Sequence, residues 1–292
     1  QIPAEELHFA VGVLKALNQN RGEHSWGCWN GKELHKFLGG VSKAPLNMFL
    51  QSNKMFGHTR FATVGARTQR NAHPFRIKGK KGTIIGAHNG SVSNYDDLAK
   101  KYEWKELEVD SEAIFLAIAN GIDFEEVRGY GAIEYVWEND PSRIYLCRLN
   151  GQLSIARVKN KGRVEGVFWS SDIDHLKKAL AVFDQDDKER WSIEMVTIED
   201  EKAYEVRLDE EDGTANVFKT DIVHKLGGRY SSTSSHSTGY AYDTKPTTSI
   251  RPEKISVEVL KDDVKKLGAM MSKYWPTTTG ATTTPTVDTT KS

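Results

Sequence analysis

The apolar positions of the first 220 residues follow two spacings, and each spacing predicts a different element. Helical spacing begins after Pro3, which suits the first turn of a helix. The apolar face of this predicted helix consists of Leu7, Ala10, Val11, Leu14 and Leu17. Further helices are predicted at residues 94–101, 112–120 and 172–183. Short or alternating apolar runs predict strands at residues 25–30, 56–63, 83–88, 132–138, 143–148, 152–158, 166–170, 194–197, 203–208 and 216–220. Strands and helices in this order predict an α+β domain.

Two stretches between these runs carry turn signals. Residues 78–82 form a compact basic cluster between apolar runs, which predicts a solvated hairpin tip. Asn150-Gly151 is a strong hairpin signal, so the strands at 143–148 and 152–158 are expected to pair. Residues 31–53 show no readable pattern.

The composition changes near Gly227, and a flexible C-terminal extension is expected there. We assign residues 1–222 to one domain, 223–254 to a polar linker, 255–275 to an amphipathic helix and 276–292 to a disordered Thr/Pro-rich tail. The apolar seam of the helix consists of Val257, Leu260, Val264, Leu267, Met271 and Tyr274. A single helix with such a seam is expected to dock, either on its own domain or on a partner.

Composition excludes several classes of function. The chain has 292 residues, 38% of them hydrophobic, and a formal net charge of zero, so neither nucleic acid nor an anionic membrane is an expected partner. Its two cysteines, Cys28 and Cys147, lack metal-ligand spacing, and neither a metal nor a cofactor is expected. No apolar run is long enough to span a bilayer. The expected location is the cytoplasm of a bacterium or of a phage-infected cell, with a virion as the alternative.

Residues 58–112 carry the candidate chemistry, which suits an amino-acid pocket. Arg60, at the end of a predicted strand, offers parallel N–H donors for an α-carboxylate. Asp110, before a predicted helix, offers a carboxylate for an α-ammonium group. Attack on a carboxamide forms an oxyanion that needs two prepositioned donors, and Asn89 and Gly90 offer a side-chain amide and a backbone N–H. Gly90 also has no side chain to block close approach.

The order of these motifs resembles the glutaminase domain of class II glutamine amidotransferases, over roughly residues 1–220. The motifs are RGEHSWG at 21–27, HTRFATVG at 58–65, NAHPF at 71–75, GAHNGSVSNY at 86–95 and DSEAI at 110–114. The likeness is strongest to small stand-alone members of bacteria and phages. It implies an N-terminal-nucleophile fold, a four-layer α/β/β/α sandwich.

The resemblance also implies roles for individual residues. Asn89 and Gly90 would form the oxyanion hole, and Arg60, Thr63 and Asp110 would bind glutamine. Structural roles near the pocket would belong to Arg21, His73 and His88. Position 64 is valine where many relatives have histidine, so any contact made by that imidazole is missing.

The nucleophile of this family is a cysteine at the amino terminus, whose own α-amino group acts as the base. The printed chain starts with Gln1, and Cys28 and Cys147 both lie inside apolar, strand-like runs. Two hypotheses follow. With a terminal cysteine in the native protein, the domain hydrolyses glutamine to glutamate and passes ammonia to a separate enzyme. Without that cysteine, it is an inactive amidotransferase-fold protein with a binding or structural role, and the helix at 255–275 would attach it to its partner.

Overall fold

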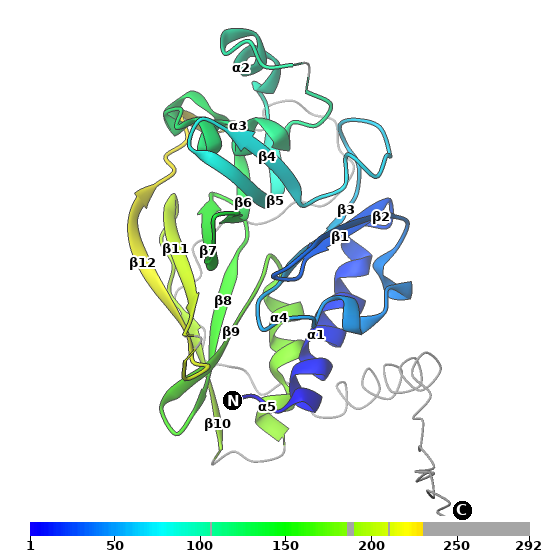
Figure 1. Ribbon diagram of the computed structural model, residues 1–292, viewed down its shortest axis with the longest axis vertical. Coiled ribbons are helices and arrows are strands. Elements are labelled where there is room, and N and C mark those ends of the chain that lie inside the picture. Colours follow the sequence, from blue (N-terminus) through cyan, green and yellow to red (C-terminus); the bar gives the residue numbers. More distant parts are fainter. Residues whose placement is uncertain (106, 186–189, 210, 230–292) are drawn as a thin grey trace, which may run out of the picture. The chain divides into compact units, whose positions relative to one another are not determined.

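The computed structural model describes residues 1–229, apart from 106, 186–189 and 210 (Figure 1). Contacts divide the chain into Gln1–His236 and Ser237–Ser292. The predicted helix at 255–275, the tail at 276–292 and most of the predicted linker lie outside the described residues. No helix in the described part is long and apolar enough to cross a membrane.

The larger sheet has antiparallel strands from both halves of the domain. Its strands run in the order β12-β11-β7-β6-β5-β4. They are β4 (Phe75–Gly79), β5 (Gly82–Val92), β6 (Arg128–Trp137), β7 (Asp140–Leu149), β11 (Lys202–Leu208) and β12 (Ala215–Val223). A two-residue strand, β13 (Gly228–Arg229), pairs parallel with β6. The ordered chain therefore continues past the predicted domain boundary at residue 222.

Two smaller antiparallel sheets form a second layer. One has the order β2-β1-β3 and the other β10-β8-β9. The first contains β1 (Ser25–Trp29), β2 (Leu34–Leu38) and β3 (Phe56–Arg60), and the second β8 (Ser154–Asn160), β9 (Arg163–Ser170) and β10 (Trp191–Val196). Among the described strands, β3 pairs only with β1 and β9 only with β8, so each keeps one open edge.

Helices cover both outer faces, and each interface between layers has its own apolar core (Figure 1). The helices are α1 (Ala4–Asn18), α2 (Tyr95–Lys101), α3 (Ser111–Asn120), α4 (Ile173–Leu180) and α5 (Val182–Gln185), with short 3₁₀ turns at Gln19–Arg21, Val41–Lys43, Leu46–Met48 and Phe124–Glu126. Phe115 and Ile114 of α3 pack with Ile133 and Tyr135 of the larger sheet. Trp29, Phe56, Val136, Ile144 and Leu146 belong to the core between the sheets. Ala10 of α1 and Leu176 of α4 pack with Phe168 of β9. These layers confirm the predicted α/β/β/α sandwich.

Several boundaries and one strand pairing differ from the prediction. The Asn150-Gly151 turn does not form a hairpin, because β7 pairs with β6 and β11 whereas β8 lies in another sheet. A tight turn after Trp137 joins β6 to β7 instead. The hairpin predicted at residues 78–82 is confirmed by the β4–β5 register. The predicted helix at 172–183 is divided into α4 and α5, and the unreadable stretch at 31–53 contains β2.

Candidate active site

Arg60 and Asp110 are both buried and near enough to influence each other electrostatically. Arg60 is the last residue of β3 and is 5% exposed, and Asp110, which precedes α3, is 6% exposed. Burial lowers the pKa of the Arg60 guanidinium, and the Asp110 carboxylate opposes this shift. Oppositely charged groups are therefore buried at the same place, as the prediction of an amino-acid pocket requires.

Local backbone contacts orient both of these side chains. The Arg60 guanidinium donates to the carbonyl oxygens of Val64, at 2.5 Å, and Ala66, at 3.4 Å, in the loop that follows β3. Its other N–H groups have no hydrogen-bond partner among the described residues. The Oδ2 atom of Asp110 accepts the buried N–H of Val92 at 2.7 Å. Both side chains are thus fixed in direction and keep polar atoms for a ligand. Thr63 lies in the same loop and is exposed.

Asn89 and Gly90 lie on β5, opposite Ala132 and Gly131 of β6. Asn89 is partly exposed and has no side-chain hydrogen bond to a described residue. The structure explains the glycine at position 90 differently from the expectation that it leaves room for a substrate. A Cβ atom there would lie 2.1 Å from the Tyr130 carbonyl oxygen, so the missing side chain lets two backbones approach each other.

Three histidines lie near these strands: His73 and His88 are buried, and His58 is partly exposed. His58 stacks on His73 with ring centroids 4.3 Å apart, and the Nδ1 atom of His73 accepts the backbone N–H of His88 at 3.2 Å. The His88 ring contacts the Ser111 hydroxyl at 3.0 Å and the Tyr130 carbonyl at 3.2 Å. Burial lowers the pKa of His58 to about 3 and those of His73 and His88 below their ordinary value. The three rings are therefore neutral at pH 7 and serve as hydrogen-bonding and packing groups.

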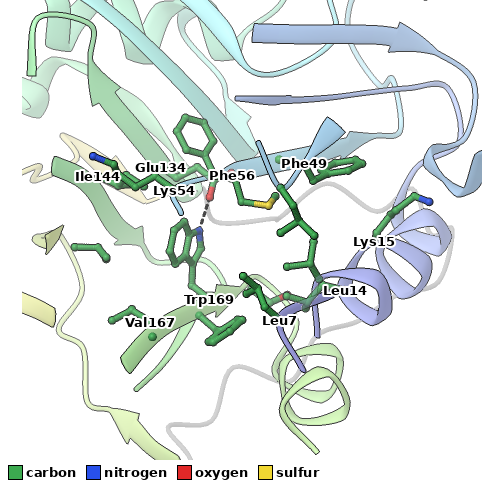
Figure 2. Close-up of a pocket in the computed structure, with 18 of the residues that line it drawn as sticks. Leu7, Leu14, Lys15, Phe49, Lys54, Phe56, Glu134, Ile144, Val167 and Trp169 are labelled. Atoms are coloured by element: carbon green, nitrogen blue, oxygen red, sulfur yellow. Dashed lines mark hydrogen bonds between the residues drawn. The ribbon is translucent and has the colours of Figure 1, made fainter. Parts of the chain in front are cut away.

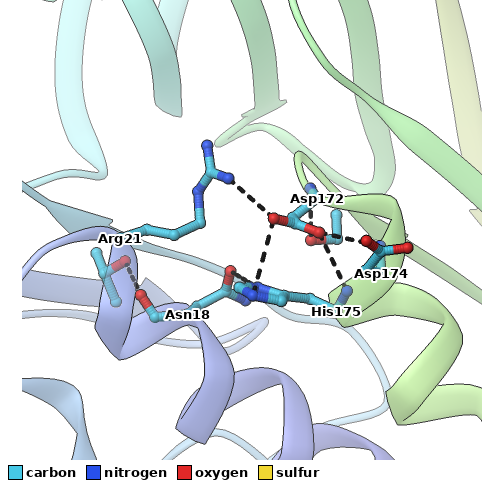
Figure 3. Close-up of polar contacts among 7 residues, drawn as sticks. Asn18, Arg21, Asp172, Asp174 and His175 are labelled. Atoms are coloured by element: carbon cyan, nitrogen blue, oxygen red, sulfur yellow. Dashed lines mark hydrogen bonds and ion pairs between the residues drawn. The ribbon is translucent and has the colours of Figure 1, made fainter. Parts of the chain in front are cut away.

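Arg21 contacts a residue 151 positions further along the chain (Figure 3). Its guanidinium pairs with the Asp172 carboxylate at 3.2 Å, and Asp172 also caps α4 by accepting the N–H groups of Asp174 and His175. The His175 ring contacts Asn18 Oδ1 at 3.1 Å. Gly22 follows Arg21, and a Cβ atom at Gly22 would lie 2.3 Å from the backbone of Arg60. The ends of β3 and β9 are therefore held next to each other.

A cavity of about 710 Å³ lies between the open edges of β3 and β9. Its wall includes residues 56–59 of β3, 166–170 of β9, 132–134 of β6 and several residues of α1, with Asn89 also on the wall. Figure 2 shows Leu7 and Leu14 of α1 facing Phe56 and Trp169 across this space. The cavity is mostly apolar and extends along β3 and β9, each of which has one unpaired edge among the described strands.

Neither cysteine has the environment of a nucleophile. Cys28 and Cys147 are both fully buried. Burial raises the pKa of the Cys28 thiol to about 12 and also raises the pKa of the Cys147 thiol, so neither forms a thiolate at neutral pH.

The sequence matches the family model of class-II glutamine amidotransferases over residues 42–136. This match confirms the resemblance drawn from the motifs over that part of the chain.

Curated relatives match this chain over parts of their own length. An amidophosphoribosyltransferase of Methanocaldococcus jannaschii is 35% identical over 109 residues, which cover 35% of this chain and 22% of that protein. A glutamine–fructose-6-phosphate aminotransferase of Pyrococcus horikoshii is 30% identical over 194 residues, which cover 59% and 31%. The chain thus spans less than a third of these two relatives.

The fold is also similar to a solved structure. A glutamine phosphoribosylpyrophosphate amidotransferase from B. subtilis, complexed with ADP and GMP, has a TM-score of 0.50 and 16% identity, over 75% of this chain and 47% of that one. This likeness shows a shared N-terminal-nucleophile fold.

Two polar features of the site were missed by sequence reasoning. Asp172 becomes a partner of Arg21 only through the packing of α4 beside α1. Glu134 lies on the cavity wall, where it accepts the indole N–H of Trp169 at 2.6 Å. A charged residue in the middle of the apolar run 132–137 was the available signal for Glu134.

Proposed function

We propose that this domain hydrolyses glutamine to glutamate and ammonia through a thioester on an amino-terminal cysteine, and that the ammonia goes to a separate enzyme. The cysteine would precede Gln1 in the native protein. The observation that carries the proposal is that Arg60 and Asp110, two oppositely charged side chains, are both buried and influence each other electrostatically. A cavity with two open strand edges lies in the same domain, and Asn89 is on its wall, whereas Arg60 and Asp110 are not.

Glutamine would bind through its charged end. The free N–H groups of Arg60 suit the α-carboxylate, because a planar guanidinium can donate two parallel hydrogen bonds. The second oxygen of Asp110 suits the α-ammonium group, while its first oxygen stays on the N–H of Val92. Thr63, in the loop held by Arg60, would contact the same end of the substrate.

The cavity would accommodate a strand that carries the nucleophile. The Arg21–Asp172 pair holds the far ends of β3 and β9 together near Arg60, and the nitrogen of Gln1 lies 2.8 Å from Glu165 Oε2 at the start of β9. A segment running from the site to Gln1 would lie antiparallel to both strands. Open strand edges are favourable templates for an added strand, which would here join the two smaller sheets.

The first residue of that strand would lie beside Asn89 and Gly90. Its α-amino group would take the thiol proton, and the thiolate would attack the side-chain carboxamide carbon. The tetrahedral oxyanion would receive hydrogen bonds from the Asn89 amide and the Gly90 N–H. Its collapse would expel ammonia, which takes up the proton, and water would then cleave the thioester to glutamate and restore the thiol.

The buried histidines support this division of roles. His73 and His88 are neutral and have protein partners, which favours an architectural role over that of a general base. Arg21, paired with Asp172, would likewise organise the pocket rather than react.

The test is the intact mass and amino-terminal sequence of the protein from its native source, followed by a glutaminase assay. We expect a Cys-Gly start about one strand length before Gln1 and release of glutamate from glutamine. Replacing that cysteine by alanine should abolish turnover without loss of folding. A native start without cysteine, together with no turnover, would refute the glutaminase and favour the binding or structural role.

A further inference from the structure

Glu134 is a carboxylic acid in a mostly apolar layer. Along β6, Ile133 and Tyr135 face the helical layer, whereas Ala132 and Val136 belong to the core between the sheets. Since side chains alternate along a strand, Glu134 faces that inter-sheet core. It also lies on the wall of the 710 Å³ cavity.

The carboxyl group of Glu134 is incompletely satisfied by its surroundings. The indole N–H of Trp169 donates to Oε2 at 2.6 Å, and no other described residue forms a hydrogen bond or ion pair with this side chain (Figure 2). Burial raises the pKa of Glu134 to about 8. Glu134 is only partly exposed and lies on the cavity wall. A carboxyl group largely removed from water is costly unless hydrogen bonds compensate it, so the free oxygen favours a polar partner in the cavity.

The register of β9 indicates where that partner would come from. Val167 and Trp169 both pack toward the core between the sheets, so this face of β9 is the one beside Glu134. In an antiparallel pair, directly opposite residues point to the same side of the sheet. A strand in the cavity would therefore direct toward Glu134 the side chain of the residue opposite Trp169.

We propose that Glu134 and Trp169 form a subsite for a hydrogen-bonding side chain, so that the strand filling the cavity carries a hydroxyl, amide or cationic residue opposite Trp169. This inference rests on the proposed function, which supplies the strand. It adds a specific contact that selects one residue of that strand and aligns its register, and with it the position of the nucleophile.

The experiment uses the full chain with an added segment. The sequence Cys-Gly-Val-Val-Gly-Val-Ser, about the length needed to run beside β9 at roughly 3.3 Å per residue, is fused directly before Gln1. With Gln1 beside Glu165, an antiparallel count along β9 puts the fourth added residue opposite Trp169. Threonine replaces this fourth residue or, as a matched control, the third residue, which would face the helices. Threonine and valine have the same shape and differ in one hydroxyl group. Each form is made with Glu134, with Glu134→Gln and with Glu134→Leu, and unfolded in urea.

We expect threonine at the fourth position to raise the folding equilibrium constant about fivefold to tenfold over valine, the effect of one buried hydrogen bond. The gain should shrink with Glu134→Gln, disappear with Glu134→Leu, and be absent for threonine at the third position. A threonine effect that is the same in all three backgrounds would overturn the subsite.

Two further outcomes separate this inference from the function on which it rests. If the extensions stabilise the chain but show no coupling to Glu134, the subsite is wrong and the inserted strand stands. If no extension stabilises the chain relative to the form starting at Gln1, the inserted strand itself is refuted. The native amino-terminal sequence gives an independent result, because an apolar residue opposite Trp169 would contradict the subsite.

Discussion

Substitutions of Asp110 can separate its structural bond from its proposed contact with glutamine. Oδ2 accepts the buried N–H of Val92 at 2.7 Å, while the charge lies close to Arg60. Asp110→Asn keeps an oxygen for Val92 and removes the charge. Asp110→Ala removes both and leaves a buried N–H group without a partner.

The two variants should therefore differ in stability and agree in ligand binding. An unsatisfied buried N–H costs about 1–3 kcal/mol, so the free energy of unfolding of Asp110→Ala should lie about 2 kcal/mol below that of Asp110→Asn. Loss of a buried ion pair with the α-ammonium group costs about 2–5 kcal/mol, and each 1.4 kcal/mol is tenfold in affinity. Both variants should therefore bind glutamine at least about 30-fold more weakly than the parent.

The assay combines urea unfolding with glutamine titration of the native form in which the terminal cysteine is replaced by alanine, so that no turnover occurs. Variants of Asp209, an exposed aspartate that forms only local turn contacts in the described structure, serve as controls for a general effect of lost charge. If Asp110→Asn binds glutamine within threefold of the parent, the assigned role in ammonium recognition is wrong. If both variants have the same free energy of unfolding, the hydrogen bond from Val92 to Asp110 does not contribute to stability.

Two further predictions concern stability. In Gly90→Ala the new methyl group would lie 2.1 Å from the Tyr130 carbonyl oxygen, so we expect the free energy of unfolding, measured by heat or urea, to fall by about 2–3 kcal/mol. Gly162→Ala is the control, because only the positive φ opposes a side chain there, and it should cost about 1 kcal/mol. Equal losses in the two variants would contradict the packing argument. Burial lowers the pKa of His224 to about 4, so between pH 7 and pH 5 the imidazole takes up a proton in the unfolded chain but not in the native state. His224 should therefore lower the free energy of unfolding by about 2 kcal/mol as the pH falls from 7 to 5. His224→Gln should remove that part of the pH dependence in urea titrations, and an unchanged slope would refute it.

Sequence patterns were informative wherever the deciding interactions are local. Residues 4–18 form a helix as predicted, because the apolar period acts over short distances. The strand predicted at 56–63 is also present, although β3 ends at Arg60. The motif residues could be assigned to a glutamine pocket because carboxylate, ammonium and oxyanion each require a particular partner type. The four-layer arrangement followed from the resemblance carried by those motifs.

Tertiary structure decided what depends on partners far apart in the sequence. Asn150-Gly151 has hairpin chemistry, yet β8 joins β9 and β10, because a strand takes the neighbours with which it can bury a face. Gly90 is required by the Tyr130 backbone, and Arg21 is oriented by Asp172, contacts that no local pattern contains. The position of Glu134 on the cavity wall likewise exists only after the two layers of sheet pack together. The amino-acid sequence thus determined the elements and the chemical groups, and long-range packing determined which of those groups meet.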